Sequence, residues 1–263
     1  MTDSLLVSTS AGVATITLNR PESLNALNRE VWKAIGEAAV EVGQDPDARV
    51  VVLRGAGPRA FSAGLDVKAA VREGVDAGAP ARDTFNRITA MQLAFTAIEN
   101  CPLPVIASIH GYCLGGALEL ALCCDIRICC EDAVFGLPEV GLGIMPDMGS
   151  TQRLPRVVGP GMARELVYTS RRIAAREAER IGLVNHVYTA DELEAETQRL
   201  ASEIAGNSPV AVQNSKRALN IAASAPLAVG LQFETAMALS GLSDGNGASF
   251  AERGAQIGSS ARS

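Results

Sequence analysis

Hydrophobic and polar positions along the first fifty residues predict a strand–helix–strand unit. Residues 13–18 alternate with a period of two and end at Asn19-Arg20-Pro21, which predicts a strand followed by a turn. Apolar residues then recur every three or four positions through residues 31–42, and Asn28 is placed to cap the helix that this spacing predicts. The short apolar run at residues 49–53 predicts the second strand.

Strands and helices continue to alternate along the middle of the chain. A loop is predicted over residues 55–64, then a short helical segment, and Gly74–Pro80 is small and polar enough to be predicted as a mobile lid. The next predicted elements are a helix over 83–100, a strand over 104–110, a helix opened by Gly115-Gly116, and a strand over 125–130. This alternation indicates an α/β protein, and by itself it favours a doubly wound parallel sheet. Further on, the pattern predicts helices over 192–204, 209–223 and 226–242.

Composition and charge narrow the class of protein. With 23 Lys and Arg against 29 Asp and Glu the net charge is −6, so nucleic acid is not expected as a partner. The longest apolar stretch, residues 113–124, is interrupted by Glu119 and is too short to span a bilayer. The opening Met-Thr-Asp-Ser has an acid where targeting peptides carry basic residues, so we expect a cytoplasmic protein that does not bind membranes. The 6 cysteines contain no C-x-x-C pair, which is typical of reduced core thiols.

Glycines that follow the strand predicted at 104–110 are candidates for an anion site. Gly111, Gly115 and Gly116 lie where this strand ends and a helix begins, so free backbone N–H groups and the positive end of the helix dipole meet there. Their spacing fits neither the dinucleotide nor the nucleoside-triphosphate fingerprint. An anion or a developing oxyanion would be stabilised at this point. Glycines used only for close packing of helix against strand would give the same pattern.

Three carboxyl groups are candidates for proton transfer, whereas the 2 histidines are expected to be structural. Glu119 lies in an apolar helix, where desolvation favours the neutral acid; the alternative is a buried ion pair with Arg127. Glu139 lies in a loop fixed by proline and glycine, and is otherwise a surface acid. Asp147 is most simply a helix cap ahead of Gly149.

Five segments carry the most specific patterns in the chain. They are Leu18–Leu27 (LNRPESLNAL), Phe61–Asp66 (FSAGLD), Gly111–Ala121 (GYCLGGALELA), Phe135–Pro146 (FGLPEVGLGIMP) and Thr151–Arg156 (TQRLPR). In this order, and over nearly the whole chain, they resemble the successive signatures of the crotonase (enoyl-CoA hydratase/isomerase) family. The resemblance implies a crotonase-type spiral of ββα units over residues 1–190 in place of a doubly wound sheet. It also implies a helical region over residues 191–263 that covers the active site and forms homotrimers, or hexamers built from two trimers.

The resemblance further implies an acyl-CoA thioester as substrate. The backbone N–H groups of Leu65 and Gly116 would hold the thioester oxygen, and their hydrogen bonds would strengthen as that oxygen becomes enolate-like. The residues implied in substrate and CoA binding are Ala63, Leu65, Asp66, Lys68, Gly116 and Phe250. No metal is implied, and no cofactor other than the coenzyme A that is part of the substrate.

Glu119 and Glu139 match the pair of glutamates in the hydratases of this family. The resemblance implies that the pair binds one water, which adds to C3 of a trans-2-enoyl-CoA. Glu139 would protonate C2 and Glu119 would accept a proton or a hydrogen bond from the water, in fatty-acid or related acyl-CoA degradation. Such a pair stays useful when the two environments separate the proton affinities of its members.

Two departures from the family pattern leave other functions open. Ala117 replaces a third glycine, and Asp147-Met-Gly-Ser replaces Gly-Ala-Gly-Gly. Asp147 stands where dienoyl-CoA isomerases of the family carry a catalytic aspartate, and residues 94–110 also resemble that branch. That branch has an aspartate at the position of Glu119. The alternatives are therefore a 3,5-dienoyl-CoA to 2,4-dienoyl-CoA isomerase that uses Glu139 and Asp147, and a non-catalytic acyl-CoA binder.

Overall fold

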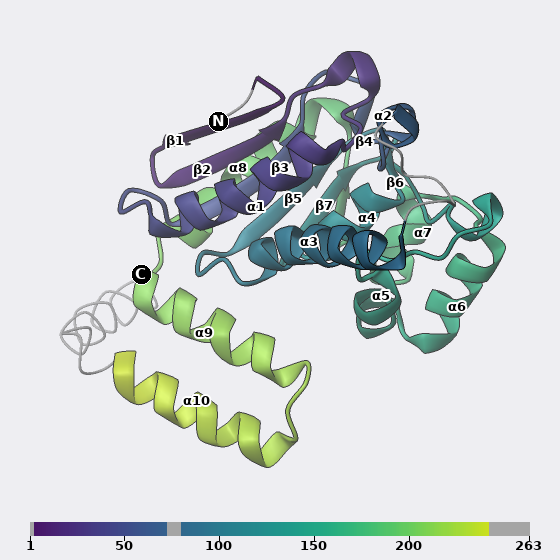
Figure 1. The fold of residues 1–263 in the computed structure, drawn as a ribbon. Coiled ribbons are helices and arrows are strands. Elements are labelled where there is room, and N and C mark those ends of the chain that lie inside the picture. Colours follow the sequence, from purple (N-terminus) through teal and green to yellow (C-terminus); the bar gives the residue numbers. More distant parts are fainter. Residues whose placement is uncertain (1–2, 73–79, 242–263) are drawn as a thin grey trace. The chain divides into compact units, whose positions relative to one another are not determined.

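The structure is a computed structural model that describes residues 3–72 and 80–241. The chain divides into two compact units, residues 1–203 and residues 204–263 (Figure 1). Of the predicted lid at Gly74–Pro80, only Pro80 belongs to the described residues, so the lid itself lies outside them. The first unit is built on two sheets, and the second on a pair of helices.

A six-stranded sheet forms the centre of the first unit, in the order β1-β2-β3-β5-β7-β10. Its strands are β1 (Leu5–Ser10), β2 (Val13–Leu18), β3 (Val50–Gly55), β5 (Val105–Ile109), β7 (Ile126–Cys130) and β10 (His186–Tyr188). The β1–β2 pair is antiparallel, and the other neighbouring pairs are parallel. Strand β2 confirms the period-two prediction over residues 13–18. Parallel strands are covered on both faces, which explains why β3 and β5 are short continuous apolar runs.

A second sheet, in the order β4-β6-β8-β9, is made of very short strands. They are β4 (Ala60–Ser62), β6 (Tyr112–Leu114), β8 (Val134–Gly136) and β9 (Ile173–Ala174). Strand β4 lies inside the segment predicted as a loop over residues 55–64, so that prediction was wrong there. Two or three residues are too few for a hydrophobic period to mark a strand.

The two sheets are connected by a repeating turn of the chain. Strands β3 and β4 lead to α2 (Val67–Arg72), β5 and β6 to α4 (Gly116–Ala121), and β7 and β8 to α5 (Ser150–Val158). Each turn therefore contributes one strand to the large sheet, one to the small sheet, and then a helix. This is the crotonase-type ββα spiral that the resemblance implied, and it replaces the doubly wound sheet that the alternation alone favoured.

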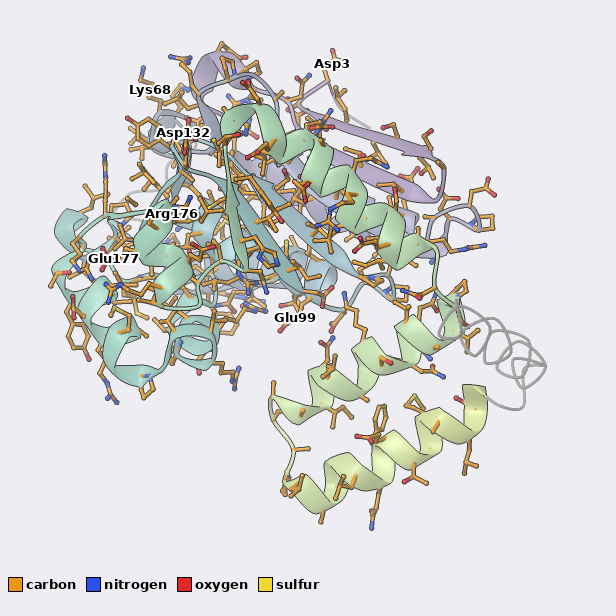
Figure 2. The ribbon with its side chains drawn as sticks, turned by 180° about the vertical axis from the view of Figure 1, so that it is seen from behind. Asp3, Lys68, Glu99, Asp132, Arg176 and Glu177 are labelled. Atoms are coloured by element: carbon orange, nitrogen blue, oxygen red, sulfur yellow. The ribbon has the colours of Figure 1, made fainter. Side chains whose placement is uncertain are left out.

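Helices cover both faces of the large sheet. Helices α1 (Arg29–Gln44) and α3 (Ala81–Glu99) lie over one face, and α8 (Ala190–Ala205) crosses the other, as the opposite views of Figures 1 and 2 show. The Asn28 side chain accepts a hydrogen bond from the Val31 N–H at 2.9 Å, which confirms the predicted cap of α1. On the other face, a hydrogen bond of 2.9 Å between the Ser108 and Thr197 hydroxyls links β5 to α8.

The remaining elements surround this core or belong to the second unit. They are η1 (Pro21–Ser23), η2 (Val140–Leu142), α6 (Pro160–Thr169), α7 (Ala175–Arg180), α9 (Pro209–Ala222) and α10 (Leu227–Gly241). The predicted C-terminal helices correspond to α8, α9 and α10. Asn214 of α9 donates hydrogen bonds to the Met237 carbonyl at 3.0 Å and to the Ser240 hydroxyl at 3.1 Å, which ties α9 to α10. Within residues 3–72 and 80–241, no helix is long and apolar enough to cross a membrane.

The six cysteines are buried and unbridged, as predicted for core thiols. Burial raises the pKa of Cys123 and of Cys129 to about 12, so both thiols stay neutral at physiological pH. A neutral buried thiol is a poor nucleophile and a poor metal ligand. These residues therefore contribute packing to the core around α4 and β7.

Candidate active site

The two glycine-containing segments that sequence analysis connected to an oxyanion lie against each other. A Cβ added to Gly64 would lie 2.3 Å from the Leu114 carbonyl oxygen and 3.2 Å from the Gly116 nitrogen, and the φ angle of Gly64 is +84°. Only glycine tolerates both this contact and this backbone conformation. The approach therefore brings the segment that carries Leu65 next to the first turn of α4.

Both predicted oxyanion donors are free to bind a substrate oxygen. Leu27 donates its N–H to the Gly64 carbonyl at 2.7 Å and accepts from the Asp66 N–H at 3.0 Å, which leaves the Leu65 N–H between them unused. The Leu65 N–H has no acceptor among the described residues. Gly116 is the first residue of α4, where an N–H has no partner within its own helix. Two such donors at one point can stabilise a developing negative charge on oxygen.

Trp32 of α1 supports both segments and was not singled out by the sequence analysis. Its indole N–H donates to the Leu27 carbonyl at 2.8 Å. A Cβ on Gly116 would lie 3.1 Å from the edge of the indole ring, so the ring packs directly against that glycine. The indole ring also stacks on the ring of Phe95 of α3, with 4.8 Å between the ring centroids. The only signal in the sequence was that Trp32 is the 1 tryptophan of the chain and lies within the helix predicted after Asn28.

Glu119 lies in the buried interior of α4 with a side chain fixed by hydrogen bonds. Its Oε1 accepts from the Ser150 hydroxyl at 2.7 Å, from the Met148 N–H at 3.1 Å and from the Ser150 N–H at 3.2 Å. Burial raises the pKa of Glu119, the Ser150 and Met148 hydrogen bonds lower it, and the charge of Asp147 raises it. The donors offset only part of the effect of burial, so the pKa of Glu119 stays above its usual range.

The alternative of an ion pair between Glu119 and Arg127 is wrong. The Arg127 guanidinium donates to the carbonyl oxygens of Leu183 and Cys124, both at 2.7 Å, and of Ala121 at 3.4 Å. Ala121 and Cys124 lie at and just after the end of α4, where carbonyl oxygens attract a cation, and Leu183 follows α7. Arg127 therefore caps a helix, and Glu119 is left to the donors around Ser150.

Glu139 follows β8 and lies against the start of α4, with far fewer hydrogen bonds to its carboxyl group than Glu119 has. Its Oε2 is buried and has no hydrogen-bond partner in the described part of the chain. Its Oε1 lies against Gly115, where an added Cβ would come within 2.7 Å. Burial, partly offset by its own backbone N–H, and then the charges of Glu119 and Asp147 raise the pKa of Glu139 to about 7. Glu139 is therefore not the surface loop acid that was its alternative, and it is poised to hold or release a proton near neutrality.

Asp147 is half-buried near both glutamates, and its predicted role as a helix cap is wrong. The residue at the start of α5 is Gly149, with a φ of 108° and no side-chain capping bond. Burial raises the pKa of Asp147, while its own backbone N–H and the charge of Arg87 on α3 lower it. Gln92 of α3 donates to the Asp147 carbonyl oxygen. The structure thus brings all three predicted carboxyl groups into one cluster. Met148, next to Asp147, donates to Glu119, and Oε1 of Glu139 lies against Gly115, whose carbonyl accepts from the Glu119 N–H.

Arg153 and Ser150 are two further residues of the site that sequence reasoning missed. Arg153 donates to Glu99 at 2.6 Å and to the Thr96 hydroxyl at 3.1 Å, which fastens α5 to α3. Ser150 is 31 positions from Glu119, and no local pattern connects them. The usable signal was the Gly149-Ser150 pair just before the predicted Thr151–Arg156 motif, since glycine there allows a tight turn that aims the following N–H groups.

The residues implied in CoA binding differ in how they are held. Ala63 is half-buried and Leu65 is 37% exposed, so the side chain of Leu65 borders the oxyanion site. The carboxylate of Asp66 pairs with Arg20 at 2.9 Å and caps the Ala69 N–H at 2.9 Å. Lys68 is exposed at the outer edge of the molecule on α2 (Figure 2). Phe250 lies outside the described residues.

Comparisons with known proteins identify relatives of this chain. Residues 8–255 match the profile of the family described as enoyl-CoA hydratase/isomerase. The crotonyl-CoA hydratase of Syntrophomonas wolfei is 43% identical over 79% of this chain and 78% of its own length. The peroxisomal Δ(3,5)-Δ(2,4)-dienoyl-CoA isomerase of Arabidopsis thaliana is 40% identical over 80% of this chain and 78% of its length. The crystal structure of an enoyl-CoA hydratase from Bacillus anthracis superposes with a TM-score of 0.83 at 38% identity, and covers 89% of each chain.

Proposed function

Since the chain belongs to the enoyl-CoA hydratase/isomerase family, we propose that it is an enoyl-CoA hydratase that reversibly adds water across the 2,3 double bond of a trans-2-enoyl-CoA. One observation carries the proposal. A hydrogen-bonded glutamate, Glu119, and an unpaired glutamate, Glu139, lie in one carboxyl cluster beside the first turn of α4. Hydration needs a group that accepts from water and a group that donates a proton to carbon, and these two environments favour that division.

The geometry suggests how each group acts. The Leu65 and Gly116 N–H groups bind the thioester oxygen. Removing either donor would cost about 3–4 kcal/mol of transition-state stabilisation. Ionised Glu119 accepts a proton from water as its oxygen adds to C3. Protonated Glu139 gives its proton to C2, so that one hydroxyl and one hydrogen are added in total. A proton transfer from Glu119 to Glu139 restores the starting state.

The named relatives support the substrate class, and no further cofactor is proposed. A relative with 43% identity is a crotonyl-CoA hydratase, so a short enoyl-CoA is a reasonable first substrate to test. Coenzyme A enters as part of that substrate. Leu65 and Gly116 would contact its thioester, and Ala63, Asp66 and Lys68 lie on the adjoining segment and α2.

Dienoyl-CoA isomerisation is the second candidate, because Asp147 shares the carboxyl cluster. An isomerase needs an acid and a base at the two ends of a conjugated system, and Glu139 with Asp147 could supply them. The 40% identity to a dienoyl-CoA isomerase is consistent with this activity. Against it, Oε1 of Glu119 is fixed by three hydrogen bonds, which hydration uses and this isomerisation does not need.

One assay separates the two candidates. Purified protein is given crotonyl-CoA and a 3,5-dienoyl-CoA side by side, and loss of the enoyl absorbance is followed together with formation of the 2,4-diene. We expect hydration of crotonyl-CoA to be the faster reaction and to survive in Asp147→Asn. Faster conversion of the dienoyl-CoA, abolished in Asp147→Asn, would assign the protein to the isomerases instead.

The second unit supports a further proposal, that the protein is a homotrimer or a hexamer of two trimers. Helix α10 has no buried residue, and Leu227, Leu231 and Leu239 are 79%, 53% and 61% exposed. A helix this apolar on its surface is typical of one that is covered by another chain. Light scattering at micromolar concentration tests the proposal, and a stable monomer would contradict it.

A further inference from the structure

We propose that Ser150 is a positioning residue of this active site, whose hydroxyl fixes Oε1 of Glu119 and so presents Oε2 to the substrate water. The inference rests on the hydratase function proposed above and assigns the side chain that prepares its water-accepting group. Ser150 itself touches Glu119 and not the reacting atoms. Its role is therefore to orient another residue and to set its charge state.

The hydrogen bond from Ser150 is the shortest of the three that end on Glu119. The Ser150 hydroxyl lies 2.7 Å from Oε1, whereas the Met148 and Ser150 N–H groups lie 3.1 and 3.2 Å away. Ser150 is 0% exposed and Glu119 is 2% exposed, so water does not compete for this bond. Hydrogen bonds to a charged acceptor are stronger than neutral ones. All three donors bind Oε1, and Oε2 accepts no hydrogen bond from the residues that the structure describes.

The backbone fixes the place of the hydroxyl. Ser150 is the first residue of α5, directly after Gly149 with its left-handed φ of 108°. That turn aims the Ser150 hydroxyl and the adjacent N–H groups at Glu119. Helix α5 is in turn held by Arg153, which bonds Glu99 at 2.6 Å on α3. Ser150 thus lies on a supported helix end and not on a free loop.

The charges around Glu119 explain why this bond matters. Asp147 raises the pKa of Glu119, as burial does, while Arg153 on α5 contributes an opposing positive charge. Cys123 donates to the Glu119 carbonyl oxygen at 3.4 Å and is neutral, because burial raises the pKa of its thiol to about 12. Glu139, also in the cluster, has a pKa raised to about 7. The Ser150 hydroxyl lowers the pKa of Glu119, and so favours the ionised state that accepts a proton from water.

Ser150→Ala tests the inference, because it removes the hydroxyl and keeps both backbone donors. Ser108→Ala is the matched control: its hydroxyl is buried and bonds Thr197 at 2.9 Å, in β5 and α8, outside the carboxyl cluster. The value of kcat/KM for crotonyl-CoA hydration is measured across pH in both variants of the full-length protein. We expect Ser150→Ala to lose at least about fivefold more activity at about pH 5.5 than at about pH 7, since its acidic limb moves to higher pH.

Two further measurements separate positioning from simple support of the fold. Ser150→Cys keeps a weaker donor of similar size, and its acidic limb should fall between those of wild type and Ser150→Ala. The melting temperature of Ser150→Ala should fall further below that of wild type at about pH 8 than at about pH 5, because the lost bond favours ionised Glu119. The melting temperature of Ser108→Ala should fall by the same amount at both pH values.

The outcomes distinguish the inference from the function on which it rests. If wild-type protein does not hydrate crotonyl-CoA, the hydratase proposal fails, and the pH dependence of the melting temperature still reports on Ser150. The inference on Ser150 is overturned, while the hydratase proposal stands, if wild type hydrates crotonyl-CoA and two results hold for Ser150→Ala. Its kcat/KM falls by the same factor at every pH, and its melting temperature falls by the same amount at about pH 8 and about pH 5.

Discussion

Glu119 and Glu139 belong to one cluster and burial raises the pKa of both, but the hydrogen-bond donors around them differ. Glu119 is buried in a helix and its Oε1 accepts three hydrogen bonds, from Met148 and Ser150. Glu139 lies after a strand with Oε2 buried and unpaired. Three donors stabilise a carboxylate, whereas a buried oxygen without a donor stabilises the protonated acid.

The comparison teaches that two residues of one type acquire different roles through their hydrogen-bond donors. The α5 end with its Gly149 turn supplies those donors to Glu119 alone. Glu139 receives mainly desolvation and the repulsion of Glu119 and Asp147, which together raise its pKa to about 7. Hydration uses this difference directly, since one carboxyl group accepts from water while the other gives a proton to C2. Each of the following changes tests one side of the comparison.

The largest effect is expected from Glu139→Gln. The amide cannot donate the proton that C2 requires, so turnover should fall at least about a hundredfold, with acyl-CoA affinity kept within about tenfold. Steady-state hydration and a binding titration measure the two quantities. Glu131→Gln, an exposed acid on the nearby β7–β8 connection, is the control and should leave both unchanged. Retention of more than half of the wild-type turnover would remove Glu139 from the mechanism.

The next effect concerns pH. Glu139 must be protonated to act as the acid, and its pKa is raised to about 7. The value of kcat/KM should therefore decline on the alkaline side of this pH, approaching about tenfold per pH unit, because the protonated fraction falls at that rate. Rate measurements in buffers of constant ionic strength check this. Activity that stays constant to about pH 9 would show that Glu139 does not work as the proton donor.

Asp147→Asn should have a smaller effect on hydration, within about tenfold, because hydration does not route a proton through this residue. The charge of Asp147 raises the pKa of Glu139, so its removal should move the alkaline limb of kcat/KM to lower pH. The same pH series measures both quantities. A loss of more than about a hundredfold would mean that Asp147 takes part in the chemistry.

The smallest effect is expected from Trp32→Phe, which keeps an aromatic ring but removes the 2.8 Å hydrogen bond to the Leu27 carbonyl. One neutral hydrogen bond contributes about 1 kcal/mol, so we expect a loss of kcat of about threefold to tenfold from a less well-ordered oxyanion site. Because Trp32 is the 1 tryptophan of the chain, wild-type fluorescence should also change when an acyl-CoA binds. An unchanged kcat would show that Trp32 does not support the Leu65 segment.

The long elements were predictable from the sequence because their hydrophobic periods are long. Strand β2 and the Asn28 cap of α1 lie where the spacing placed them. Strands β4, β6 and β8 have three residues each, which is below the length at which a period is visible, so the spiral followed only from the family resemblance.

The candidate residues of the site were also predictable, but their contacts were not. The structure brings Glu119, Glu139 and Asp147 together, yet the only partner that the sequence offered for Glu119, as an alternative, was Arg127, and the partner found is Ser150. Arg127 is nearer in sequence, but its guanidinium donates to the carbonyl oxygens of Ala121, Cys124 and Leu183. Asp147 was expected to cap α5, and Gly149 occupies that position with a φ that favours glycine. Sequence proximity misled in both cases, because contacts over long separations depend on how the turns of the spiral stack.

The most direct test of the account is to find which glutamate carries a proton at neutral pH. Infrared difference spectra between about pH 5.5 and about pH 8.5 report the C=O stretch of a protonated buried carboxyl group. Because the pKa of Glu139 is raised to about 7, the account predicts a band that is lost as the pH rises through about 7. The band should be absent in Glu139→Gln. It should persist in Glu119→Gln with a lower midpoint, because the charge of Glu119 no longer raises the pKa of Glu139. A band that persists in Glu139→Gln and disappears in Glu119→Gln would contradict the account, because Glu119 would then be the acid.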